Sequence, residues 1–235
     1  MLNKRPLLDF YTGIVTIEQI FRTICETNDA LEKELMKGKN IAQLSQENTR
    51  FCDMQNFILT HIETLELKQY AEYLMECMID FNFKETSSVP SNTIIIYDNR
   101  LSVSDYDLVS HISLYYHTLN SAICAIDVCK ELPLMVRDIV FVLCLLHDFG
   151  KNTKVQKKYK NKNESHDQTS ARFALDTMSQ FGINEELKNT IFTTLFYHHD
   201  TERKETTTYL PMLVEADVEA RILEKKFIKM QKGIQ

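Results

Sequence analysis

Long stretches of the chain place apolar residues every three or four positions, which is the spacing that puts them on one face of an α-helix. One such stretch begins after Thr16 and ends near Gly38. A second runs from about Ser45 to Phe81 and is long enough for two helices. The N-terminal part is therefore predicted to be helical.

The helical pattern stops in residues 87–91, where Ser and Pro gather as they do in linkers. Thr93 to Tyr97 is β-branched and predicts a short strand. After Ser104 the helical spacing resumes almost to the end of the chain. Five further helices are expected, at about 105–131, 133–149, 167–181, 184–199 and 208–230.

This pattern predicts an all-α protein with three parts. Residues 1–86 form a helical extension, which serves as a lid, a dimerisation surface or a partner site; residues 87–104 are a linker, and 105–230 are the main helical bundle. The composition agrees, since only five Gly and four Pro in 235 residues favour long helices over a turn-rich β fold.

Charge and cysteine usage narrow the class of protein. The formal net charge of −6 argues against a chain that binds nucleic acid over its whole surface. The six cysteines include no Cys-x-x-Cys pair and mostly occupy apolar helical positions, which indicates a reducing compartment. No apolar leader follows Met1, and the longest apolar run is far short of the about 20 residues of a membrane span. A cytoplasmic protein is expected, with no membrane association.

The strongest chemical feature is a carboxylate at the end of an apolar helix. Ile139 to Leu146 is apolar on every side, as in a helix at the centre of a fold, and it leads directly into His147 and Asp148. Burying an unpaired carboxylate costs on the order of several kcal/mol, so a cation is needed beside it. The neighbouring histidine favours a metal ion over a salt bridge.

Further histidines and one aspartate fall on the inward faces of the other predicted helices. A single inward histidine is more often a hydrogen-bonded core residue than a ligand, but their occurrence over five consecutive helices favours a shared site. His61 and His111 have no such context and are interpreted as structural or surface residues. The candidates are His117, His147, Asp148, His166, His198, His199 and Asp217.

The order of these residues resembles the HD-domain superfamily of metal-dependent phosphohydrolases. The run from Leu145 to Lys151, Leu-Leu-His-Asp-Phe-Gly-Lys, is similar to the most recognisable segment of that family. The resemblance covers about residues 105–225 and not the N-terminal hundred. It implies an HD-domain helical bundle.

The resemblance also implies two metal ions. His117, His147, Asp148 and Asp217 would hold one, and Asp148 would bridge to a second held by His166, His198 and His199. Mononuclear members lack the middle histidines. Imidazole and carboxylate ligands suit Mn, Fe, Ni, Co or Zn, and Mg less well.

The expected reaction is hydrolysis of a phosphate ester, most simply a phosphodiester of a nucleotide-like substrate, by a hydroxide bridging the two metals. Asp148 and Lys151 are the candidate catalytic residues. Lys151 is placed to hold a phosphate oxygen, although a basic residue at a helix C-terminus is also favoured by the helix dipole alone.

Several alternatives remain open at this level. The segment Lys151 to Lys162 carries six lysines and Tyr159, and as a basic loop near the site it would suit single-stranded nucleic acid. An HD-type nuclease is therefore the first alternative. An oxygenase with two irons on the same scaffold and a regulatory, partner-binding module with a vestigial site are the others. No Gly-Tyr-Pro follows His199, which argues against a cyclic-di-GMP phosphodiesterase of the HD-GYP type.

Overall fold

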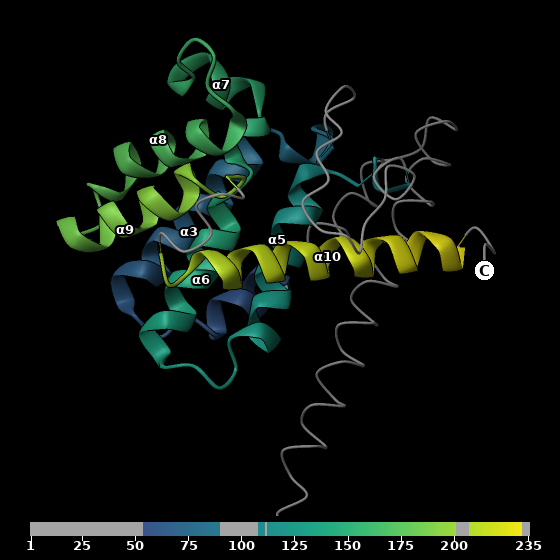
Figure 1. Ribbon diagram of the computed structural model, residues 1–235, viewed down its shortest axis with the longest axis horizontal. Coiled ribbons are helices and arrows are strands. Elements are labelled where there is room, and N and C mark those ends of the chain that lie inside the picture. Colours follow the sequence, from purple (N-terminus) through teal and green to yellow (C-terminus); the bar gives the residue numbers. More distant parts are fainter. Residues whose placement is uncertain (1–53, 90–107, 111, 201–206, 232–235) are drawn as a thin grey trace, which may run out of the picture. The chain divides into compact units, whose positions relative to one another are not determined.

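The computed structural model describes residues 54–89, 108–110, 112–200 and 207–231 (Figure 1). Within these residues there are α-helices, two short 3-10 helices and no strand, so the predicted all-α fold is confirmed. In chain order the elements are α3 (Leu65–Asp80), η1 (Phe83–Glu85), α5 (Leu114–Val128), α6 (Leu134–Leu146), η2 (Phe149–Lys151), α7 (Thr153–Tyr159), α8 (His166–Met178), α9 (Glu185–Phe196) and α10 (Leu210–Gln231).

Residues Gln55–Lys225 make up one compact unit, which takes in α3 and η1 as well as α5 to α9 and most of α10. None of the described helices is both long and apolar enough to cross a bilayer. The predicted helix after Thr16 and the predicted strand Thr93 to Tyr97 lie outside the described residues. The stretch predicted as two helices is helical at 54–60 and again in α3.

Helix α6 is the centre of this unit, as its apolar sequence predicted. Every residue from Ile139 to Leu146 is buried, and α6 packs against α3, α5, α8 and α9. Burying one large aliphatic or aromatic side chain contributes about 1.5–3 kcal/mol. The C-terminal end of α6 is therefore held in place by the most apolar packing of the unit, and this is where His147 and Asp148 follow.

The other predicted helices are present, and capping residues set their ends. α5 begins at Leu114, later than predicted, because the Ser113 side chain accepts a hydrogen bond from the backbone N–H of Tyr116. α8 begins at His166 behind a capping box of Ser165 and Gln168. Figure 1 shows α8 and α9 lying side by side, and these two helices pack extensively against each other.

The basic segment predicted as a loop, Lys151 to Lys162, instead contains a helix. The Asn152 side chain accepts a hydrogen bond from the backbone N–H of Lys154 and so caps α7, while Val155 is buried. The Asn152 amide also donates to the backbone oxygen of Phe81, just past α3. The prediction of a loop was wrong because this cap and one buried apolar residue stabilise a helix of two turns in a sequence dominated by lysine.

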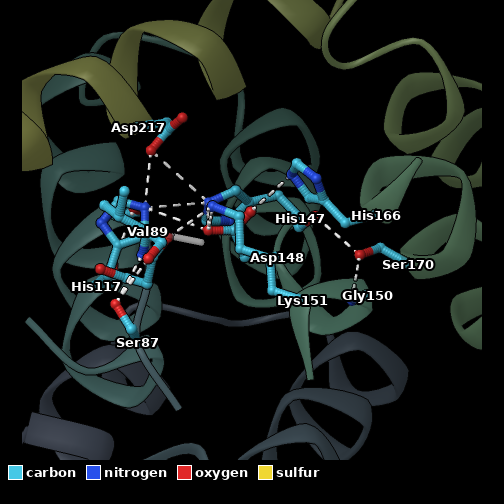
Figure 2. Close-up of polar contacts among 12 residues, drawn as sticks. Ser87, Val89, His117, His147, Asp148, Gly150, Lys151, His166, Ser170 and Asp217 are labelled. Atoms are coloured by element: carbon cyan, nitrogen blue, oxygen red, sulfur yellow. Dashed lines mark hydrogen bonds and ion pairs between the residues drawn. The ribbon is translucent and has the colours of Figure 1, made fainter. Parts of the chain in front are cut away.

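Gly150 is the position where the turn after α6 meets α8. Its N–H donates to the hydroxyl of Ser170 at 2.7 Å, and that hydroxyl donates to the backbone oxygen of His147 at 2.9 Å (Figure 2). A Cβ atom on residue 150 would overlap the carbonyl oxygen of His166. Only glycine allows η2 to lie this close to the first turn of α8.

We therefore expect Gly150→Ala to lower the free energy of unfolding by about 1–3 kcal/mol, because the methyl group forces η2 and α8 apart. Gly182→Ala is the matched comparison. Gly182 has a φ of +68° but open space around it, so only the backbone conformation resists the change, at about 1–2 kcal/mol. Thermal and urea unfolding measure both, and the expectation fails if Gly150→Ala is as stable as the wild type.

Candidate metal centre

Four helices and the turn after α6 bring all seven candidate residues to one place. His117 lies in the middle of α5, and His147 and Asp148 follow α6. His166 is the first residue of α8, and Asp217 lies in the second turn of α10. His198 and His199 follow the end of α9. Figure 2 shows His117, His147, Asp148, His166 and Asp217 converging from these separate elements.

A first group of ligand atoms surrounds the Nε2 atom of His117. This nitrogen lies 2.9 Å from Oδ1 of Asp217, 3.4 Å from Nε2 of His147 and 3.6 Å from Oδ2 of Asp148. Ligands that share one transition-metal ion at about 2.1 Å lie about 3 to 3.6 Å from one another. The spacing of this group is therefore that of a metal site.

A second group forms on the other oxygen of the same aspartate. Oδ1 of Asp148 lies 3.4 Å from Nε2 of His166, which in turn lies 2.8 Å from Nε2 of His199. These three residues also satisfy the spacing of a metal site. The two oxygens of Asp148 thus face two different groups of ligand atoms.

His198 lies between the groups but closer to the first. Its Nε2 atom is 3.8 Å from Oδ2 of Asp217, and it clusters with His147 and Asp217. The resemblance had placed it with His166 and His199 instead. The difference arises because consecutive residues after a helix point in different directions, so that the buried His198 faces α6 and α10 while the half-buried His199 faces α8.

The ligand atoms need a partner that the protein itself does not supply. Neither ring nitrogen of His198 has a hydrogen bond, and Oδ1 of Asp148 has none either, although all three atoms are buried. Each buried polar atom left without a partner costs about 1–3 kcal/mol. In two pairs of imidazoles, His117 with His147 and His166 with His199, the Nε2 atoms face each other. A cation shared by each pair would bind both nitrogens. The residues present therefore fit a divalent transition metal.

The protonation states of the two aspartates also suit metal binding. Burial raises the pKa of Asp148, but the charges of His147 and Lys151 overcome this effect and hold the pKa well below its usual range. Burial raises the pKa of Asp217 as well, and its hydrogen bond and attraction to His117 bring it far below normal. Both carboxylates are therefore ionised at neutral pH.

Among the histidines, burial lowers the pKa of His198 to about 3 and holds that of His199 well below its usual value. Both imidazoles are therefore neutral, which is the form that binds metals. Burial also lowers the pKa of His147, but attraction to Asp148 outweighs it and the pKa is raised. A proton on His147 is thus held by the same carboxylate that a metal would neutralise.

Hydrogen bonds on the far side of two ligand rings fix their orientation. Nδ1 of His147 lies 2.7 Å from the backbone oxygen of Cys144, and Nδ1 of His117 lies 3.1 Å from Oε1 of Glu224. Because both oxygens can only accept, each Nδ1 donates, and each Nε2 faces the site, where it would offer a lone pair to a metal once it carries no proton.

Lys151, the second predicted catalytic residue, also reaches the site. Its Nζ atom donates to Oδ2 of Asp148 at 2.6 Å and to the backbone oxygen of Ser88 at 3.0 Å. Its side chain is 12% exposed, so it lies at the edge of the site. Lys151 is thus a cation in direct contact with Asp148, the carboxylate that faces both ligand groups.

Four polar residues around the site were missed in the sequence: Ser88, Ser170, Arg221 and Glu224. Arg221 lies four residues after Asp217, as a residue on the same helix face does. Glu224 lies seven residues after Asp217 and Ser170 lies four after His166. Helical periodicity therefore places each on the same helix face as a candidate ligand, and this spacing could have identified both from the sequence. Ser88 gave no signal, because it lies in the segment interpreted as a linker. Of the two excluded histidines, His61 contacts the backbone oxygen of Phe57 through Nδ1, and His111 lies outside the described residues.

Comparison with known families agrees with this geometry. The family model described as HD domain matches residues 114–230, from the first residue of α5 to the penultimate residue of α10. The chain therefore contains an HD domain and belongs to that superfamily of metal-dependent phosphohydrolases, which confirms the resemblance seen in the sequence. No curated protein and no solved structure matches the chain.

Because the ligand atoms come from helices across the whole unit, metal binding should stabilise the fold. A metal present at 100 times its dissociation constant adds about 2.7 kcal/mol, which raises the melting temperature by about 5–10 °C in a chain of this size. We expect this shift when Mn²⁺ is added to chelator-treated protein, and its absence in Asp148→Ala. Asp127→Ala, which removes an exposed carboxylate of α5, is the control and should keep the full shift. Equal melting curves with and without metal would contradict the expectation.

Proposed function

We propose that this protein hydrolyses a phosphodiester of a nucleotide-like substrate and uses two divalent transition-metal ions, drawn from Mn, Fe, Ni, Co and Zn. The observation that carries the proposal is the position of Asp148. Its two carboxylate oxygens face separate groups of histidines, at 3.3 Å from Nε2 of His147 on one side and 3.4 Å from Nε2 of His166 on the other. A carboxylate in this position is suited to bridging two cations.

When bound, two such cations would supply a hydroxide from water near neutral pH and would neutralise the oxygens of the phosphoryl group. The protein's own contribution is to hold the ligands in a dry, fixed arrangement. Asp148 is 1% exposed and is anchored by the packing of α6, so its position does not depend on a mobile loop.

Lys151 is suited to binding the substrate. Its Nζ atom lies beside Asp148, and cations on both oxygens of that carboxylate would weaken its hold on the ammonium group. Nζ would then be available to donate to a phosphate oxygen. Lys151 would therefore bind and orient the substrate, while Asp148 would take part in generating the nucleophile.

A complete set of candidate ligands favours an active enzyme over a regulatory module with a vestigial site, in which some ligands should be missing. The doubled histidine, His198 and His199, favours hydrolysis over oxygen chemistry. Oxygen consumption with an organic substrate, without hydrolysis of any phosphate ester, would support the oxygenase instead.

The metal-loaded protein should hydrolyse bis-p-nitrophenyl phosphate slowly and without oxygen, because a good leaving group reduces the need for specific contacts. Asp148→Ala should lower the rate at least about 1,000-fold, since it removes a ligand of both groups. Lys151→Ala should lower it only about 10–100-fold, since it removes one charge–phosphate contact. Release of p-nitrophenol is measured together with metal content, which should be close to two ions per chain in the wild type. A protein that carries two ions but hydrolyses no phosphate ester would disprove the proposed reaction.

A second candidate, a nuclease acting on single-stranded nucleic acid, is favoured by the lysines of α7. Lys157 and Lys158 of α7 and Lys160 just after it are exposed on the segment that joins two ligands, Asp148 and His166. Lys158 also donates to Tyr159, whose hydroxyl donates to Asp176. A basic helix of this kind can follow a phosphate backbone.

If the substrate is a nucleic acid, changing Lys157 and Lys160 to Gln should weaken binding of a labelled single-stranded oligonucleotide. The slope of log affinity against log salt should become shallower by about 0.7 for each phosphate that the variant no longer binds. Hydrolysis of bis-p-nitrophenyl phosphate should not change. The control variant replaces Lys68 of α3 and Lys130, just past α5, with Gln. It should leave both oligonucleotide binding and the hydrolysis of bis-p-nitrophenyl phosphate unchanged. Cleavage of small substrates only, equally fast in the wild type and in the Lys157/Lys160 variant, would leave the small nucleotide as the substrate.

A further inference from the structure

The segment Thr86–Val89, called the strap below, lies against the start of α5. The backbone N–H of Ser88 and its hydroxyl both donate to the backbone oxygen of Ile112, at 3.0 and 2.8 Å. The backbone N–H of Leu114 donates to the backbone oxygen of Thr86 at 2.6 Å. Ser88 is completely buried. The strap is thus fixed one turn before His117.

Two cationic side chains from different parts of the fold bind Ser88. Arg221 of α10 donates to the Ser88 hydroxyl at 2.8 Å and to its backbone oxygen at 3.1 Å. Lys151 donates to the same backbone oxygen at 3.0 Å. Since Lys151 also binds Asp148, the strap is connected to the ligand that faces both groups.

Arg221 continues this connection to the other side of the site. Its guanidinium donates to Oε2 of Glu224 at 3.1 Å, while Oε1 of Glu224 lies 3.1 Å from Nδ1 of His117 and accepts from the amide of Asn120 at 2.9 Å. Glu224 is 1% exposed. Ser88, Arg221, Glu224 and His117 therefore form one buried chain of polar contacts that ends on a ligand.

The two histidines of the first group differ in what holds them. His147 donates through Nδ1 to a neutral backbone oxygen, whereas His117 donates to a carboxylate. A hydrogen bond to a charged acceptor is about twice as strong as one between neutral groups, and it makes the opposite nitrogen a better metal ligand. A backbone oxygen suffices to orient the ring of His147, so what Glu224 adds for His117 is its charge.

We propose that Glu224 is a positioning residue that acts through His117, and that Arg221 and Ser88 couple the strap to the metal affinity of the first ligand group. The proposal rests on the role of His117 as a metal ligand in the proposed function. Glu224 fixes the ring and strengthens Nε2 as a ligand. Arg221 compensates the buried charge of Glu224 near Asp217 and is itself held by Ser88.

The test measures the affinity of chelator-treated protein for Co²⁺ by titration calorimetry and by the visible absorption of the bound ion. Glu224→Gln keeps the shape of the side chain but removes its charge, and it should weaken binding about 10–100-fold. It should also shift the Co²⁺ absorption bands, which a merely structural effect would leave in place. Glu215→Gln, on the exposed side of the same helix, is the matched control and should bind Co²⁺ like the wild type.

Coupling to the strap is tested with a double-mutant cycle. Ser88→Ala should weaken Co²⁺ binding about 3–10-fold, and in combination with Glu224→Gln the total weakening should be clearly smaller than the product of the two single effects. If Glu224→Gln does not fold, Arg221→Lys takes its place in the cycle, because a single ammonium group cannot bind Ser88 and Glu224 together in this geometry. Circular dichroism of the metal-free variants verifies folding.

Unchanged Co²⁺ affinity in Glu224→Gln, or independent effects of the two substitutions, would overturn the proposal. These results would not affect the proposed function, since metal binding is measured without any substrate. If the wild type binds no divalent metal, the proposed function fails first and the positioning role fails with it.

Discussion

The burial of one carboxylate, Asp148, is the constraint on which the site depends. It follows the most apolar helix of the unit, so it cannot turn toward solvent without displacing the packing of α6. An isolated carboxylate in such a place would be costly. The surrounding residues offset this cost by charge, with His147 and Lys151 in contact with Oδ2 and His166 near Oδ1. The remaining need for positive charge is what makes the position suitable for metal ions.

The backbone around Asp148 is arranged to keep these partners in place. Gly150 lets η2 touch the first turn of α8, and Ser170 joins the backbone of His147 to that of Gly150 by two hydrogen bonds. His166 therefore lies at a fixed distance from Asp148, although they are eighteen positions apart in the chain. The short helix α7 closes this loop and is tied to the end of α3 through Asn152.

Charge around the site is distributed unevenly. Asp148 and Glu224 are buried carboxylates and Asp217 is half-buried, and the cations in contact with Asp148 and Glu224 are Lys151 and Arg221, both of which also bind Ser88. With His198 and His199 held neutral by burial, three carboxylates face the two permanent cations, and attraction to Asp148 raises the pKa of His147, whose proton balances the remaining negative charge until a metal replaces it. Added cations would be attracted to these carboxylates, while the outer pair of cations keeps the cluster stable without them.

The sequence by itself determined the class of fold, the position of the central helix and the set of residues that meet at the site. It could do so because helical periodicity is local: an apolar run such as Ile139 to Leu146 and inward positions such as His117 and Asp217 are fixed by spacing alone. Periodicity could also have identified Glu224, seven residues after Asp217, but the contact of its carboxylate with His117 is visible only in the tertiary structure. The tertiary structure alone decided which atoms face each other. It placed His198 near His147 and Asp217, turned the two oxygens of Asp148 toward different histidines and brought Ser88 to Arg221 across 133 positions of the chain. Such contacts depend on how helices pack, and the packing angles of helices are not encoded in the spacing of residues along any one of them.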